Sequence, residues 1–201
     1  LGDVLRRLER NVEAVAAYDK AVALHEASGQ ENWLVYFTRG ISLERIGEWE
    51  RSEADLRKAL ELRPDQPQVL NYLGYSLVEL QVKLDEALDM IARAVDARPN
   101  DGYITDSLGW VLYRLGRYDE AVGHMERATE LMPVDPIVND HLGDVYWAVG
   151  RYREARFQWE RAMSFEPEEK DAMRIRRKLE VGLDRVLEEE GAPPLSKAND
   201  G

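Results

Sequence analysis

Cysteine is absent from the 201 residues of this chain, and histidine and phenylalanine are scarce, with three of each. Without cysteine there is no disulfide bridge, no thiolate zinc site and no cysteine nucleophile. Basic residues are also in deficit, because 27 lysines and arginines face 39 aspartates and glutamates and leave a formal net charge of −12. A general nucleic-acid binder needs a basic face to displace phosphate counterions. The composition therefore argues against nucleic acid as a partner.

Long apolar runs are missing as well. No stretch approaches the roughly 18 uninterrupted apolar residues of a membrane span, and residues 1–10 lack the apolar core of a signal peptide. We therefore expect no direct membrane insertion by this chain. Its 44% hydrophobic and 33% charged residues suffice for one sizeable folded domain.

Motifs for catalysis or metal binding are absent from the sequence. It has no Gly-rich phosphate loop, no G-x-S-x-G and no H-E-x-x-H. The group Asp140, His141 and Asp144 could hold a divalent cation, because residues i and i+4 share a helix face. A hydrogen-bonding cluster explains the same residues. We expect no enzyme, no cofactor and no metal site.

A repeat of 34 or 35 residues dominates what is present. Gly40, Gly74, Gly109 and Gly143 are spaced 34, 35 and 34 residues apart. Four prolines follow the same step, namely Pro64, Pro99, Pro133 and Pro167. A helix should end before each proline, since proline lacks the N–H and restricts the preceding residue. Between the two marks lie Ile46-Gly47, Leu115-Gly116 and Val149-Gly150, which suit helix C-termini and predict two helices per repeat.

These marks resemble the tetratricopeptide repeat, whose pattern is W-x2-L-G-x2-Y, then A-x3-F, then P. The unit over 136–169 matches the pattern at Leu142, Gly143, Tyr146, Ala155, Trp159, Ala162 and Pro167. The unit over 102–135 matches it at Leu108, Gly109, Leu112, Ala121, Met125, Ala128 and Pro133. The resemblance implies an all-α fold, a right-handed α-solenoid of helix-turn-helix units.

The spacing also predicts the boundaries of the units. We expect a partial unit over 1–28, with the end of a first helix and a second helix, so that part of this unit lies upstream. Complete units follow over 33–66, 67–101 with a one-residue insertion, 102–135 and 136–169. Residues 170–190 are expected to form one capping helix and residues 191–201 a disordered tail.

The first helix of each unit is expected to show one face to a concave groove. At about 100° per residue, Trp110 lies roughly 140° from the core stripe that contains Leu108, Gly109 and Leu112. In stacked helical repeats the first helices line the concave surface that binds partners. The predicted groove residues are Phe37, Ile41, Asn71, Tyr75, Asp106, Trp110, Tyr113, Asp140, His141, Asp144 and Trp147. We expect Trp110, Tyr75 and Tyr113 to be displayed there, and Tyr72, Tyr103 and Ile137 to pack between helices.

This aromatic and acidic groove predicts a protein-interaction scaffold that binds an extended peptide or partner segment. Aromatic side chains dominate interface hot spots, and the carboxylates could hold a lysine or an arginine, so the partner is expected to carry basic or aromatic side chains. The same carboxylates argue against a ligand with a terminal carboxylate. The alternative is a structural segment that self-associates, or extends a solenoid, through the apolar face of Val4, Leu5, Leu8, Val12 and Val15.

A closer resemblance rests on the neighbouring motifs LNYLGY at 70–75 and DSLGW at 106–110. They are similar to the C-terminal part of larger bacterial tetratricopeptide proteins, some of which are outer-membrane lipoproteins that act as adaptors for periplasmic proteases. The resemblance implies an adaptor role and placement on the periplasmic side of the bacterial cell envelope, with the cytoplasm as the alternative.

Overall fold

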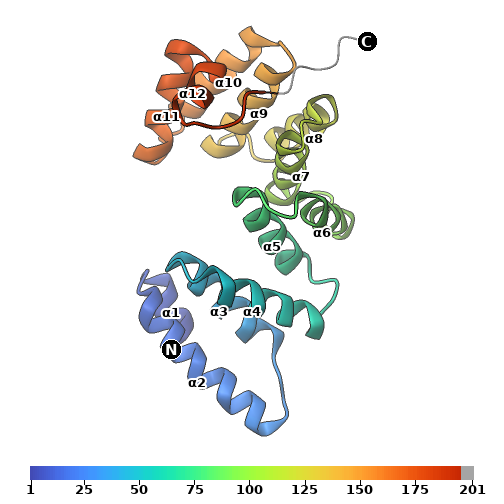
Figure 1. Ribbon diagram of the computed structural model, residues 1–201, viewed down its shortest axis with the longest axis vertical. Coiled ribbons are helices and arrows are strands. Elements are labelled where there is room, and N and C mark those ends of the chain that lie inside the picture. The colour runs from blue at the N-terminus through green and yellow to red at the C-terminus, as the bar shows by residue number, and fades with distance from the viewer. Residues whose placement is uncertain (196–201) are drawn as a thin grey trace. The chain divides into compact units, whose positions relative to one another are not determined.

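The computed structural model of the protein describes residues 1–195, and all the regular secondary structure in that range is helical (Figure 1). The helices are α1 (Gly2–Arg7), α2 (Asn11–Ser28), α3 (Trp33–Arg45), α4 (Trp49–Leu62), α5 (Pro67–Glu79), α6 (Leu84–Ala97), α7 (Gly102–Arg114), α8 (Tyr118–Leu131), α9 (Pro136–Ala148), α10 (Tyr152–Ser164), α11 (Glu169–Val181) and α12 (Leu183–Glu189). The predicted all-α fold of helix-turn-helix units is confirmed. No helix within the described residues has both the length and the apolar character needed to cross a membrane.

The helix boundaries follow the local signals in the sequence. The helices α4, α6 and α8 each end two residues before a repeat proline, at Leu62, Ala97 and Leu131. The predicted turn glycines Gly47, Gly116 and Gly150 all have a positive φ, between 75° and 80°. The side chains of Asn32, Asp101 and Asp135 accept hydrogen bonds from backbone N–H groups at the starts of α3, α7 and α9. The loop between α5 and α6, residues 80–83, is one residue longer than the corresponding loop 115–117.

The repeat glycines allow the two helices of a unit to approach closely. Gly143 of α9 lies against Trp159 of α10, and a methyl group at Gly143 would overlap the indole ring. A methyl group at Gly109 of α7 would lie 2.8 Å from the side chain of Met125 of α8. Both partner side chains are fully buried. The glycine of each repeat is therefore a packing residue, and the large side chain of the second helix fills the space that the glycine leaves.

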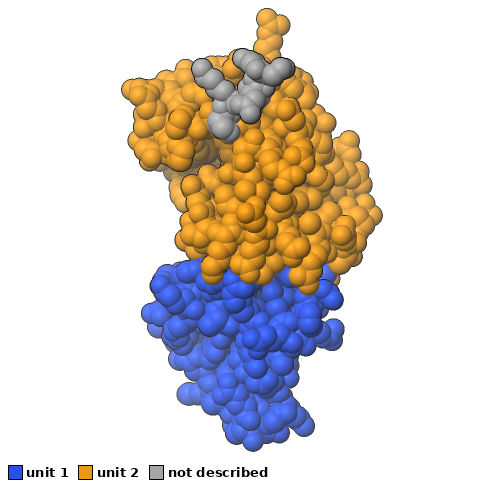
Figure 2. Space-filling view, turned by 45° about the vertical axis from the view of Figure 1, so that its right-hand side comes forward, with its two compact units in different colours: residues 1–73 blue, residues 74–201 orange. Residues whose placement is uncertain are grey.

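The chain divides into two compact units, which within the described residues are 1–73 and 74–195 and are coloured separately in Figure 2. Unit 1 contains α1 to α4 and the start of α5, and its core includes Leu5, Ala14 and Tyr18. Arg39, which departs from the leucine of the repeat pattern, donates to Asp55 at 2.6 Å and to Asp19 at 2.8 Å. Its guanidinium thus joins α3 to α4 and α2, and replaces an apolar contact with an ionic one.

Unit 2 contains the end of α5 and all of α6 to α12. Every residue of α7 from Gly102 to Tyr113 is buried except Tyr103, which is 61% exposed. The neighbouring helices α6, α8 and α9 all pack against α7. Its position inside the unit, rather than its own apolar pattern, explains why so much of this helix is buried.

The C-terminal part of unit 2 differs from the sequence-based expectation. The single capping helix expected over 170–190 is two helices, α11 and α12, which lie beside α9 and α10 (Figure 1). They are separated at Gly182, whose φ of 85° and ψ of 161° are accessible almost only to glycine. Residues 191–195, expected to be disordered, are placed, and the N–H of Ala192 donates to the carbonyl of Leu187 at 2.9 Å. The rest of the predicted tail, 196–201, lies outside the described residues.

Candidate functional site

The predicted groove residues are divided between the two units. Phe37, Ile41 and Asn71 belong to unit 1, and the other eight belong to unit 2. In unit 1, Phe37 is half-buried and packs edge-on against Tyr72, with 5.9 Å between the ring centroids. Ile41 and Asn71 are also half-buried, and the side-chain oxygen of Asn71 has no hydrogen-bond partner among the described residues.

Trp110 and Tyr113 in unit 2 are not displayed, so the prediction that they face an open groove is wrong. Trp110 is 7% exposed and Tyr113 is 6% exposed. The indole ring of Trp110 stacks between Tyr113, at 4.7 Å, and His141, at 4.0 Å. Its Nε1 donates to Glu79 of α5 at 2.9 Å. A helical wheel separates faces of one isolated helix, but here the second face is covered by side chains from α5 and α9.

The expectation for the remaining aromatic residues is met only in part. Tyr75 and Trp147 are half-buried, and Tyr75 lines a cavity described below. Tyr103, expected to pack between helices, is largely exposed, and its hydroxyl donates to Asp135 at 3.4 Å. Tyr72 and Ile137 are half-buried. Tyr75 is thus the one aromatic residue of the three singled out for display that keeps part of its surface open.

Asp106 and His141 form a buried pair between α7 and α9. The Nδ1 atom of His141 lies 3.0 Å and 3.1 Å from the two carboxylate oxygens of Asp106. Burial alone would lower the pKa of His141, but the charges of Asp106, Asp140 and Asp144 outweigh it and raise that pKa above its ordinary value. The pair therefore favours a protonated imidazole, which neutralises Asp106.

The stability of the protein should depend on pH through this pair. Because the folded pKa of His141 is raised, the pair contributes fully below the unfolded value of about 6.5, and its contribution is lost as the pH rises through the folded pKa. We expect Asp106→Asn to remove this part of the pH dependence. Urea unfolding of both proteins between pH 5.5 and 9 (roughly the range that brackets histidine titration) measures it.

His124 offers an internal reference for the same prediction. Burial lowers the pKa of His124, so its imidazole should titrate at a lower pH than that of His141 in an NMR titration of the native protein. If His141 titrated first as the pH was raised, the assigned role of Asp106 would be incorrect.

Asp140 and Asp144, predicted to hold a partner's cation, are bound by a lysine of the chain itself. The Nζ atom of Lys178 on α11 lies 2.8 Å from both carboxylate oxygens of Asp140 and 2.6 Å from Asp144. Lys178 is fully buried. Asp144 also accepts a hydrogen bond from Trp159 Nε1 at 2.9 Å and one from Arg174 at 3.3 Å.

The two carboxylates experience this cation differently. Burial raises the pKa of Asp140, and the nearby charge of Asp144 raises it further against the effect of Lys178. For Asp144 burial acts in the same direction, but the charges of Lys178 and Arg174 prevail and its pKa is lowered. Asp144 is therefore the ionised centre of the cluster, and its charge is satisfied inside unit 2.

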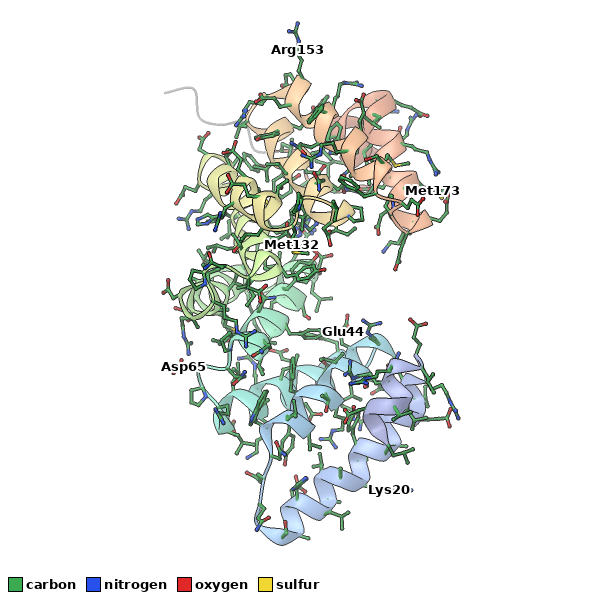
Figure 3. The ribbon with its side chains drawn as sticks, turned by 180° about the vertical axis from the view of Figure 1, so that it is seen from behind. Lys20, Glu44, Asp65, Met132, Arg153 and Met173 are labelled. Atoms are coloured by element: carbon green, nitrogen blue, oxygen red, sulfur yellow. The ribbon has the colours of Figure 1, made fainter. Side chains whose placement is uncertain are left out.

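Lys178 and Arg174 were not among the residues predicted from the sequence. Lys178 continues the buried stripe of Ala172 and Ile175 at the next i+3 position, so a lysine stands where an apolar residue was due. Met173, on another side of α11, is 62% exposed (Figure 3). A charged residue on the apolar face of a helix was the feature of the sequence that could have predicted a buried ion pair.

Two cavities open on the side of unit 2 formed by α7 and α9, the first helices of their repeats, which we call the first-helix side. The larger, of about 510 Å³, is lined by residues of α5, α7, α9, α11 and the end of α12, including Tyr75, Trp110 and His141. The smaller, of about 220 Å³, is lined by the C-terminal end of α7, by Leu187 and by residues 192–195. Arg114 lines both, and its Nε atom is buried without a hydrogen-bond partner among the described residues.

The N-terminal apolar face of unit 1 is only partly open. Val4, Leu8 and Val12 are 58%, 60% and 70% exposed, whereas Leu5 and Val15 are buried. Leu5 packs with Ala14 and Tyr18 in the core of unit 1. The face available to a further helix is therefore narrower than the sequence suggested.

Paired antiparallel helices that recur with glycine and proline at fixed positions define this chain as a helical-repeat protein. The tetratricopeptide repeat model matches residues 37–102, 81–136 and 107–166, so most of the chain is covered. The chain belongs to the tetratricopeptide repeat family.

Similar proteins agree with this assignment. The TPR repeat-containing protein PA4667 of Pseudomonas aeruginosa is 34% identical over 87 residues, which are 43% of this chain and 15% of that protein. The chain therefore spans a small part of this relative. Among solved structures, MamA AMB-1 is 25% identical with a TM-score of 0.64 and covers 86% of this chain and 92% of its own.

Two further structures show the same fold at lower identity. YrrB, described as a TPR protein with an unusual peptide-binding site, is 23% identical with a TM-score of 0.65, and 88% of each chain is covered. TTC0263, a thermophilic TPR protein of Thermus thermophilus, is 20% identical with a TM-score of 0.70 and covers 91% of this chain and 95% of its own.

Proposed function

We propose that this chain is a scaffold for protein-protein interaction, and that unit 2 binds a segment of a partner protein against α7 and α9. The observation that carries the proposal is the cavity of about 510 Å³ on the first-helix side of unit 2. Its lining combines Tyr75 and Trp110 with His141, Arg114 and Arg174, the mixture of aromatic and polar groups that fixes a peptide in place.

The fold supports a binding role over a catalytic one. Helical repeats present extended surfaces made by successive first helices, and partners bind there. YrrB, which shares the fold, is described as having a peptide-binding site. The adaptor role implied by the resemblance to larger bacterial tetratricopeptide proteins is part of the same proposal for this chain.

The proposal does not include a basic partner. The carboxylates Asp106, Asp140 and Asp144 have His141, Lys178 and Arg174 as cationic partners within unit 2. A lysine or arginine of a ligand would have to displace these buried contacts, which would cost more than an exposed exchange of charges. The expectation of a ligand cation on these carboxylates is therefore withdrawn.

A peptide selection tests the proposed site. We expect peptides selected from a random displayed library on the intact chain to bind Tyr75→Ala at least about tenfold more weakly than the wild type, because a half-buried aromatic residue at an interface is a frequent hot spot. Isothermal titration calorimetry with the tightest peptide measures the change. Phe157→Ala, which removes an aromatic ring that is 56% exposed on α10, is the matched control and should leave binding unchanged. Equal affinities for wild type and Tyr75→Ala would place the site elsewhere.

A further inference from the structure

The helix α12 covers part of the first-helix side of unit 2. Its residues Leu183, Val186 and Leu187, at helical spacing, are 0%, 3% and 6% exposed. The Nε1 atom of Trp147 on α9 donates to Asp184 at 2.8 Å. Leu187 lines the smaller cavity together with Tyr113 of α7. The chain's own C-terminal segment therefore occupies a surface made by residues of α9 and α7.

Arginines border this surface and bind the acidic end of α12. Arg177 donates to Glu189 at 2.7 Å and 3.0 Å, and Arg174 donates to Glu190 at 2.8 Å and 3.2 Å. The segment LDRVLEEE at 183–190 thus carries an apolar stripe and a carboxylate end, and both find complementary groups. The surface beneath α12 is therefore complementary to a short acidic amphipathic helix.

The attachment of α12 is suited to exchange. A helix of 7 residues is not stable in isolation, so α12 depends on its packing against unit 2. It follows α11 through Gly182 alone, so a single residue links the two helices. The covalent link gives α12 a high effective concentration, so a competing helix must bind better than α12 does.

Arg114 provides a contact that α12 leaves unused. Its Nε atom is buried without a hydrogen-bond partner among the described residues, and it lines the smaller cavity beside residues 192–195. Residues 191–195 read GAPPL and bring no carboxylate to it. A buried donor without an acceptor is costly, so a ligand that supplies one gains affinity there.

We infer that the partner segment bound by unit 2 is a short acidic amphipathic helix that displaces α12 and binds the surface that α12 covers. A carboxylate after the last turn of this helix pairs with Arg114. The inference rests on the proposed function and names its ligand. The inferred ligand is acidic, whereas the sequence predicted a basic one. The reason is that the groove carboxylates are paired within unit 2, while Arg114 at the border has a buried nitrogen without a hydrogen-bond partner among the described residues.

Competition with α12 is tested on the intact chain. The probe is a fluorescent peptide with the sequence of residues 182–195. Val186→Asp should release α12 by placing a charge in its buried stripe, and the peptide should then bind about tenfold or more tightly than it binds the wild type. Arg185→Gln, on the exposed side of α12, is the matched control and should bind as the wild type does. Fluorescence anisotropy measures affinity, and hydrogen exchange of residues 183–190 reports release.

A second variant covers the case in which Val186→Asp fails to fold. Glu189→Gln with Glu190→Gln removes the pairs with Arg177 and Arg174 and leaves the apolar stripe intact. It should also increase peptide binding over the wild type. Equal binding to the wild type and to a released variant, or no binding to either, overturns the inference.

The contact with Arg114 has its own test. A probe peptide with Pro194→Glu should bind the released variant about fivefold or more tightly than the unmodified peptide, and Arg114→Gln should abolish that gain. An unchanged gain in Arg114→Gln would overturn this assignment.

The two proposals fail in different ways. If the α12 peptide binds no variant while a library peptide still binds in a Tyr75-dependent manner, the ligand assignment is wrong and the proposed function stands. If library peptides bind the wild type and Tyr75→Ala equally, the binding site proposed on α7 and α9 is wrong, whether or not the α12 peptide binds.

Discussion

Replacing Lys178 with methionine is expected to destabilise unit 2 by about 3–5 kcal/mol, since it leaves two buried carboxylates without their shared cation. Lys178 is fully buried and lies within 2.8 Å of Asp140 and Asp144. Methionine retains the apolar volume of the side chain but supplies no charge. The midpoint of urea unfolding, followed by circular dichroism, measures the loss.

The control for this prediction is Lys170→Met, which removes an exposed lysine from the same helix. It should change the unfolding free energy by about 0.5 kcal/mol or less. Adding Asp140→Asn and Asp144→Asn to Lys178→Met should recover part of the loss, because no buried charge then lacks a partner. A cost below about 1 kcal/mol for Lys178→Met would show that water reaches the carboxylates.

The loss should also depend on pH. Because the pKa of Asp144 is lowered in the folded protein, its ionic contribution is present above the unfolded value of about 3.9 and is lost as the pH falls through the folded pKa. The wild type therefore loses this contribution in acid, whereas Lys178→Met has already lost it. The difference in stability between the two proteins should narrow as the pH falls.

Trp159→Ala is expected to cost about 3–5 kcal/mol, the usual range for truncating a large buried aromatic residue. Trp159 is 0% exposed, and it fills the space that Gly143 leaves between α9 and α10. Its Nε1 also donates to Asp144 at 2.9 Å. Urea unfolding again measures the change, and an unchanged slope of free energy against urea confirms that the folded state is retained.

Two further variants separate packing from hydrogen bonding at this position. Trp159→Phe retains most of the ring but removes the donor to Asp144, and should cost about 1–3 kcal/mol. Phe157→Ala, at an exposed position of the same helix, should cost about 0.5 kcal/mol or less. Since Trp159 and Lys178 share Asp144, the losses from Trp159→Ala and Lys178→Met should not be additive. Strict additivity would contradict the shared cluster.

The repeat itself was readable from the sequence because its signals act locally. A proline stops a helix that would otherwise run through it, and a glycine with positive φ ends the first helix of a repeat without regard to distant contacts. The pairing of Gly143 with Trp159 is also encoded within one unit. The C-terminal end was less readable, because Gly182 lies against Trp147 of α9, a residue 35 positions earlier in the chain.

The predicted groove shows where local reasoning stops. The angular position of Trp110 on its helix was sufficient to separate it from Leu108, but burial depends on Glu79 and His141, which lie on other helices. The charge of the ligand could not be predicted from the sequence either, because Lys178 lies 34 and 38 residues beyond the carboxylates that it binds.

The sequence by itself thus determined the repeat, the paired helices of each repeat and the side of each first helix that faces away from the core stripe. Each of these follows from periodicity and from backbone preferences within a few tens of residues. Only the tertiary structure decided which side chains on that side stay exposed and which charges are paired. Burial and ion pairing are set by side chains that lie on helices of other repeats.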